Sequence, residues 1–162
     1  MACGKTHNTY VSSVGPQTLY ECVRRERRKA GGRKHRKERV QDRGVGIMDD
    51  RKIAIMIAAD SIGKGAEELG KNLMKSYIYS LTEADVKPET IMFLNRGVYL
   101  TTKGSEVLDM IEQLERGGVE ILSCGACLDY YGLNDDLAVG SVTNMYSNVE
   151  IMHDADNTIV IS

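Results

Sequence analysis

The sequence predicts an α/β fold in three layers, with a mainly parallel five-stranded sheet between helices on both faces. Along residues 52–162, short apolar runs alternate with segments whose apolar residues recur at helical spacing. The first run, Ile53–Ala59, is wholly apolar, which suits a strand buried on both faces of a parallel sheet. Strand–helix alternation of this kind implies right-handed crossovers, which place helices on both faces.

The charge distribution divides the chain into two segments. Residues 1–48 carry 12 Lys or Arg and 4 Asp or Glu, a net charge of +8, whereas residues 49–162 carry 9 and 19, a net charge of −10. The basic run from Arg24 to Arg39 has no apolar stripe to bury, so we predict a basic, disordered extension over 1–48 and a folded domain over 49–162. Nucleic-acid binding is expected only if this extension belongs to the native protein; translated sequence upstream of a start at Met48 is the alternative.

Composition also restricts the class of protein and its compartment. No apolar run approaches the ~20 residues of a membrane span, and no apolar segment near the N-terminus predicts secretion. Four cysteines are too few for a disulfide scaffold, so we expect a reducing, cytoplasmic compartment. They are Cys3, Cys22, Cys124 and Cys127.

The first half of the domain is expected to contain two strands and a helix. After Ile53–Ala59, a turn at Gly63-Lys-Gly65 leads into a helix whose apolar positions are spaced three and four apart. These positions are Ala66, Leu69, Leu73, Met74, Tyr77, Ile78 and Leu81. Pro88 then breaks the chain before a second strand over 90–94, and Asn95-Arg96-Gly97 forms its exit turn.

The second half is expected to contain two long helices, one short helix and three strands. Ser105 is predicted to cap a helix that ends at Gly117-Gly118, and a third strand covers 120–123. A short helix follows over Gly125–Tyr131, and a brief fourth strand over 137–139. The last helix presents Val142, Met145, Tyr146, Val149 and Met152, and a closing strand spans 158–161.

Three polar or reactive residues come at or just after the ends of predicted strands. They are Asp60, Asn95 and Cys124, and sites in open parallel sheets lie at the carboxyl ends of strands. We therefore expect these loops to face one crevice. Its further candidate lining residues are Gly63, Gly65, Gly125 and Tyr131. The spacing of the glycines after the first strand is not a dinucleotide or Walker motif, and it favours a tight turn.

Cys124 and Cys127 are the candidate catalytic residues. Cys124 ends a strand and Cys127 falls in the first turn of the next helix, where partial positive charge favours a thiolate. Packing of two buried cysteines at the junction is the alternative without chemistry. A single C-x-x-C supplies half of the ligands of a structural zinc, so we expect no metal and no cofactor. A dithiol redox pair remains open, although the sequence has no Trp before Cys124 and no proline near it.

The segment Ile121–Leu133, followed by Leu137–Tyr146, resembles the C-terminal domain of the YedF family of sulfurtransferase-like selenium metabolism proteins. The resemblance extends to Gly63–Leu81 and Gly104–Leu108, and covers about residues 52–162. That domain is similar to the DsrE/DsrF sulfur-relay superfamily, which implies a parallel sheet sandwiched by helices and a homo-oligomer. In sulfur-relay members a cysteine eight residues before a glycine carries persulfide sulfur, and Cys124 and Gly132 have this spacing.

The resemblance implies a sulfur or selenium carrier with Cys124 as the persulfide-bearing thiolate and Cys127 as a helper. Two features depart from the family. The usual TusA-like domain with its Cys-Pro motif is missing from residues 1–48, so a relay needs a TusA-like carrier in trans. Arg96 also stands where an Asn-Gly-Gly turn typically has glycine. The rival hypotheses are a non-catalytic oligomerising binding module and a dithiol oxidoreductase.

Overall fold

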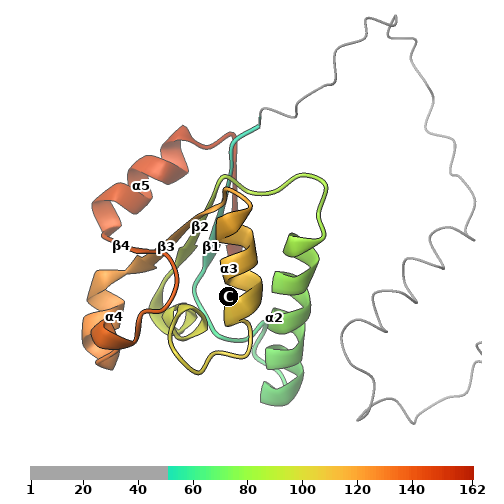
Figure 1. Ribbon diagram of the computed structural model, residues 1–162, viewed down its shortest axis with the longest axis vertical. Helices are drawn as coiled ribbons and strands as arrows, with labels where there is room; N and C mark the ends of the chain where they lie inside the picture. Colours follow the sequence, from blue (N-terminus) through green and yellow to red (C-terminus); the bar gives the residue numbers. More distant parts are fainter. Residues whose placement is uncertain (1–50) are drawn as a thin grey trace, which may run out of the picture. The chain divides into compact units, whose positions relative to one another are not determined.

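The structure, a computed structural model, describes residues 51–162 (Figure 1). The basic extension predicted over 1–48 lies outside the described residues. Within the described part, every strand belongs to one sheet, and the sheet supplies the frame that positions the cysteines.

The sheet has five parallel strands in the order β4-β3-β2-β1-β5. In chain order they are β1 (Ile53–Ile57), β2 (Thr90–Phe93), β3 (Glu120–Cys124), β4 (Ser141–Thr143) and β5 (Asn157–Ile161). The central strand β2 is buried along its whole length, as expected for a strand whose last three residues are apolar.

Helices cover both faces of the sheet, which confirms the predicted fold class (Figure 1). The α-helices are α2 (Glu67–Thr82), α3 (Leu108–Arg116), α4 (Gly125–Tyr131) and α5 (Met145–Asp154). Two 3-10 helices, η1 (Asn95–Thr101) and η2 (Asn134–Asp136), complete the domain.

The core consists of two apolar clusters, one on each side of the sheet. In the larger cluster, Met74 and Ile78 of α2 and Ile111 and Leu114 of α3 are at most 1% exposed. Burying a side chain of this size stabilises the fold by about 1.5–3 kcal/mol. The smaller cluster lies under α5 and contains Ala54, Met92, Leu94, Leu122 and Cys124.

The predicted fourth strand was wrong. Val139 is buried and Leu137 forms an antiparallel bridge with Thr102, so both apolar side chains anchor a loop. The true edge strand β4 starts after Gly140, whose φ of 79° turns the chain. Val142 therefore lies in β4 and not in the last helix.

The start of α5 follows from local polar chemistry. The Asn144 side chain accepts a hydrogen bond from the Ser147 N–H at 3.0 Å, so the helix begins after this capping residue. The predicted cap at Ser105 lies two residues before the N-cap residue, Val107, and its hydroxyl accepts a hydrogen bond from the Val107 N–H at 3.3 Å. The Asn95-Arg96-Gly97 turn is the start of the longer helix η1.

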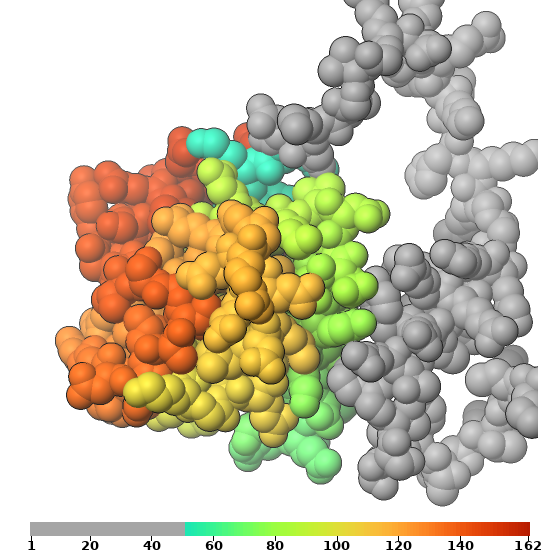
Figure 2. Space-filling view, in the orientation of Figure 1, coloured from blue at the N-terminus to red at the C-terminus, as the bar shows by residue number. Residues whose placement is uncertain are grey.

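The segment after η1 and the segment containing η2 lie side by side on the surface, in yellow and orange in Figure 2. The Lys103 N–H donates to the Asp136 carbonyl at 2.9 Å beside the bridge between Thr102 and Leu137. These contacts tie the loop before α3 to the loop before β4. No helix among residues 51–162 is long and apolar enough to cross a membrane.

Candidate functional site

The cysteine pair lies where β3 passes directly into α4. Cys124 is both the last residue of β3 and the N-cap residue of α4, and Cys127 is in the first turn. Gly125 avoids crowding between them, because a Cβ there would lie 2.9 Å from the Val142 side chain of the neighbouring strand. The sequence prediction of a helix over Gly125–Tyr131 is confirmed.

The two sulfurs differ in their access to solvent. Cys124 is 4% exposed and belongs to the apolar cluster under α5. Cys127 is partly exposed and packs against both apolar clusters. Both are free thiols, and Cys124 is near enough to Cys127 to affect the pKa of the Cys127 thiol. A molecule arriving from solvent therefore meets Cys127 first.

Burial raises the pKa of the Cys127 thiol above its ordinary value, and the contact with Cys124 raises it further. The Asn95 backbone N–H donates to the Cys127 sulfur at 3.1 Å and acts in the opposite direction. The expected stabilisation of a thiolate by the helix start is outweighed at Cys127, because α4 has seven residues and desolvation penalises the charged sulfur.

Asn95 connects η1 to the cysteine helix through both its backbone and its side chain. Its φ of 47° lies in the left-handed region, which asparagine tolerates better than most residues. The Tyr131 hydroxyl donates to Asn95 Oδ1 at 2.6 Å. The Tyr131 ring also contacts Tyr99, with 5.1 Å between ring centroids. Tyr131 therefore forms a wall beside Cys127.

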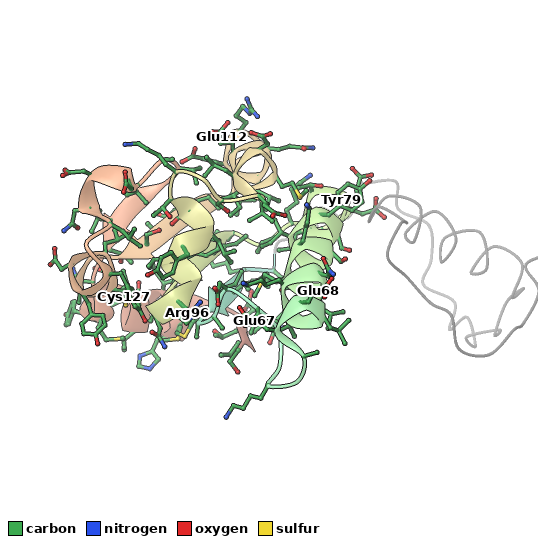
Figure 3. All side chains as sticks on the ribbon, turned by 90° about the horizontal axis from the view of Figure 1, so that it is seen from below. Glu67, Glu68, Tyr79, Arg96, Glu112 and Cys127 are labelled. Carbon is green, nitrogen blue, oxygen red and sulfur yellow. The ribbon has the colours of Figure 1, made fainter. Side chains whose placement is uncertain are left out.

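Asp60 and Arg96 form an ion pair between the loop after β1 and the start of η1. Arg96 Nε and Nη2 donate to the two carboxylate oxygens at 3.0 and 2.7 Å. These hydrogen bonds hold the pKa of Asp60 below its ordinary value, against the opposing effect of burial. The Arg96 guanidinium carbon lies 5.7 Å from the Tyr99 ring centroid. Figure 3 shows Arg96 and Cys127 on the same side of the domain.

The structure brings most of the predicted lining residues into one chain of contacts. It runs from Asp60 through η1 and Tyr131 to the cysteines, as expected for the carboxyl ends of β1, β2 and β3. Gly63 and Gly65 are not part of it. The Gly63 N–H donates to the Ser162 carbonyl, and a Cβ at Gly65 would meet no atom within 4 Å.

Arg96 and Tyr99 were missed as site residues by the sequence reasoning. Both lie in η1, three residues apart, and 3-10 spacing places such residues on one side of the helix. The sequence predicted only a three-residue exit turn here, so the 3-10 spacing of Arg96 and Tyr99 was not expected. The hydrogen bond between Thr101 and Ser123, at 2.7 Å, could not be predicted either, because it joins the end of η1 to β3, which are far apart in sequence.

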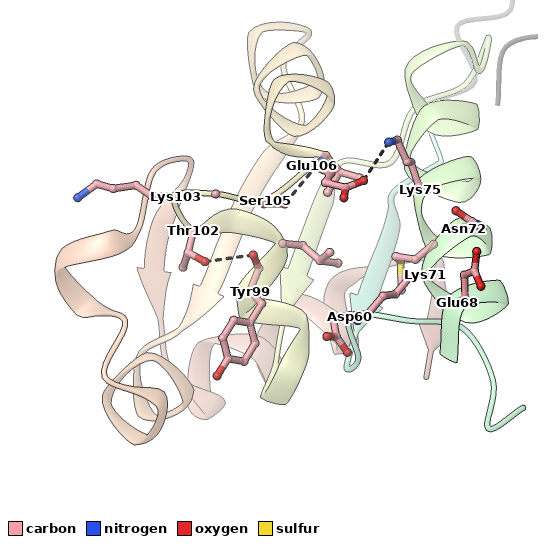
Figure 4. Close-up of a pocket in the computed structure, with 14 residues that line it drawn as sticks. Asp60, Glu68, Lys71, Asn72, Lys75, Tyr99, Thr102, Lys103, Ser105 and Glu106 are labelled. Carbon is pink, nitrogen blue, oxygen red and sulfur yellow. Dashed lines mark hydrogen bonds and ion pairs between the residues drawn. The ribbon is translucent and has the colours of Figure 1, made fainter. Parts of the chain in front are cut away.

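A groove of about 480 Å³ adjoins the ion pair and opens between α2 and the loop before α3 (Figure 4). Asp60 and Tyr99 line one end, and Lys75 of α2 bonds Glu106 across it at 3.0 Å. Neither cysteine lines the groove. Within residues 51–162, no group of three or more His, Cys, Asp or Glu side chains is arranged to hold a metal ion.

The fold and the site together define a class of protein: a five-stranded parallel α/β domain with a cysteine pair at the carboxyl ends of its strands. Residues 51–161 match the DsrE/DsrF-like family, and the chain belongs to that family. Among curated proteins, none matches the chain.

Several solved structures share this fold, among them the following two. The ychN protein from E. coli is 16% identical, with a TM-score of 0.54, and the match covers 68% of this chain and 99% of that one. A protein of unknown function, MTH1491 from Methanobacterium thermoautotrophicum, is 19% identical, with a TM-score of 0.51, and the match covers 68% and 99%. At these identities the similarity concerns the fold alone.

Proposed function

We propose that this chain is a sulfur-relay carrier that holds sulfur as a persulfide on Cys124. The observation that carries the proposal is the placement of two free thiols at the junction of β3 and α4, one buried and one partly exposed. Membership of the DsrE/DsrF-like family supports the same class of function. The buried position of Cys124 suits a carrier, because water and oxidants have little access to a sulfur held there.

The proposed transfer has two balanced steps. The Cys127 thiolate attacks the terminal sulfur of a donor persulfide, an S–S bond forms on Cys127, and the donor leaves as a thiolate that takes up a proton. The Cys124 thiolate then attacks the terminal sulfur on Cys127, so that Cys124 bears the persulfide and Cys127 returns to a thiolate. Each step exchanges one S–S bond for another and needs no external oxidant.

The partners belong to the proposal as well. A TusA-like carrier in trans would deliver or receive the sulfur, and the chain would act as a homo-oligomer. Large apolar side chains exposed on α4, β4 and α5 support self-association, because such patches mark interaction surfaces. They are Tyr130, Val142, Met145, Tyr146 and Val149.

The finer assignment is to the YedF group, with selenium as an alternative cargo to sulfur. The resemblance of Ile121–Leu133 and Leu137–Tyr146 supports it. The free thiols support a reducing compartment, for which we propose the cytoplasm.

The proposal is tested by loading the full-length protein from a small-molecule persulfide donor and mapping the added sulfur by mass spectrometry. We expect the persulfide on Cys124 in the parent. Cys127→Ser should load more slowly, because the accessible thiol is lost, and Cys124→Ser should retain sulfur on Cys127 only transiently. If Cys124→Ser gains and keeps sulfur as well as the parent does, the assignment is wrong.

The two rival functions give different results in the same preparation. A binding module with packing cysteines predicts no sulfur uptake in any variant and slow reaction of both thiols with an alkylating reagent. A dithiol oxidoreductase predicts a Cys124–Cys127 disulfide that forms reversibly at a physiological potential. Ser141→Ala, at an exposed position of the neighbouring strand β4, serves as the control and should load like the parent.

A further inference from the structure

Asn148 of α5 is fully buried, and one end of its amide has no partner. Its Oδ1 accepts a hydrogen bond from the Thr143 hydroxyl at 3.0 Å. Its Nδ2 has no hydrogen-bond partner among residues 51–162. A buried donor left unpaired destabilises a fold, and each such group in a native protein calls for an explanation.

The Asn148 amide lies on the same face of the sheet as Cys124, the proposed carrier cysteine. Thr143 is the register partner of Cys124 on the adjacent strand, and such partners project to the same face, about 5 Å apart. Ile151 and Met152, one turn after Asn148, pack on the cluster that contains Cys124. The helix α5 directly follows β4 and covers this face (Figure 1). The amide and Cys124 therefore share one buried layer.

We propose that Asn148 is a positioning residue whose Nδ2 donates to the charged sulfur on Cys124, first the thiolate and then the persulfide anion. This inference rests on the proposed role of Cys124. The members of the cluster around the sulfur are apolar, and Cys127 is a titratable neighbour of Cys124. A buried sulfur anion needs a hydrogen-bond donor. The amide nitrogen makes no hydrogen bond to the Cys124 thiol in this structure, so the contact that we propose forms when the sulfur becomes charged.

The test is a titration of Cys124 in the full-length chain with Cys3, Cys22 and Cys127 replaced by Ser. The carbon chemical shift of labelled cysteine Cβ reports ionisation of the one remaining thiol. We expect Asn148→Leu to raise the Cys124 pKa by about one unit. At a pH below the pKa of both parent and variant, this corresponds to a roughly tenfold smaller fraction of thiolate in the variant. Asn148→Asp should raise it further, because a carboxylate repels the thiolate.

Thr143→Val is the matched control, since it frees the carbonyl end of the amide but keeps the donor. Its shift should be smaller than that of Asn148→Leu. An unchanged pKa in both Asn148 variants, with altered resistance to urea alone, would mean a purely structural amide and overturn the inference. A lowered pKa in Asn148→Leu would also overturn it, because the carbonyl end would then face the sulfur.

This experiment is separate from the sulfur-loading assay. Failure of Cys124 to carry sulfur would remove the function and leave the measured pKa effect of Asn148 intact. An absent pKa effect beside normal loading of Cys124 would remove the role of Asn148 alone.

Discussion

At the scale of single residues, the site depends on polar contacts between loops that follow different strands. Asp60 after β1 holds Arg96 at the start of η1, and Arg96 in turn contacts the Tyr99 ring. Because the Arg96 side chain is 55% exposed, water screens the ion pair, and its contribution to stability is on the order of 1 kcal/mol. The pair therefore fixes the loop geometry more than it stabilises the fold.

We expect Asp60→Asn to lower the free energy of unfolding by about 1 kcal/mol at neutral pH. The folded-state pKa of Asp60 is depressed, so its contribution is present above the unfolded pKa, about 3.9, and is lost as pH falls through the folded value. Urea unfolding at neutral pH and near pH 3 measures both effects, and the difference between parent and variant should shrink at the lower pH.

The exposed pair Glu67–Lys71 on α2 provides the control for this measurement. Glu67→Gln also removes a carboxylate that accepts a hydrogen bond from a lysine, with 2.7 Å between Lys71 Nζ and Glu67 Oε1, but this pair lies exposed on the surface. No measurable change in the urea midpoint is expected there. An equal loss in both variants would contradict the special role of the Asp60–Arg96 pair.

Sequence reasoning found the cysteines, Asp60, Asn95 and Tyr131 because each follows the end of a strand or lies in the short helix after it. It did not find Asn148, because the last helix was predicted from its apolar residues, and an asparagine between them shows no sign of burial in the sequence. The pKa of Cys127 was also out of reach, because it depends on how deeply the sulfur is desolvated.

At the scale of elements, alternation of short apolar runs with helical spacing was enough to predict β1, β2, β3, β5 and the α-helices between them, but not the 3-10 helices η1 and η2. The misplaced fourth strand has a clear physical origin. A strand of three residues at the sheet edge, with Val142 60% exposed, has too few buried side chains to leave a pattern. The buried Val139 just before it gave the stronger apolar signal in a loop.

The helix η1 is held against the end of β1 by close backbone packing. A Cβ added at Gly97 would lie 2.2 Å from the Ile57 carbonyl oxygen, a contact with backbone that no side-chain rotation relieves. We expect Gly97→Ala to destabilise the domain by about 2–4 kcal/mol through overpacking, and to weaken sulfur loading because η1 carries Asn95. Urea unfolding and the loading assay are the measurements.

Gly65→Ala is the matched substitution, since a Cβ at that position would meet nothing within 4 Å. Its free energy of unfolding should stay within about 0.5 kcal/mol of the parent. If both variants lose a similar amount of unfolding free energy, the cause is the replacement of a glycine as such, and not the contact with Ile57.

At the scale of the whole molecule, residues 51–162 supply all five strands of the sheet and both apolar clusters. The family match has nearly the same bounds, 51–161. A segment of this size with a two-sided core is sufficient for an independently folding domain. We therefore propose that residues 1–48 are not needed for the stability of the fold at physiological ionic strength.

We expect a chain shortened to residues 48–162 to unfold at the same urea midpoint as the full-length protein, within error. The comparison belongs at physiological ionic strength, where a Debye length of about 8 Å screens most of the repulsion in a domain with an excess of ten acidic residues. At low salt the urea midpoint of the shortened chain should fall below that of the full-length protein, because the shortened chain lacks the +8 charge of residues 1–48. A lower midpoint at high salt as well would show that the extension packs on the domain, and the boundary near Met48 would have to be moved.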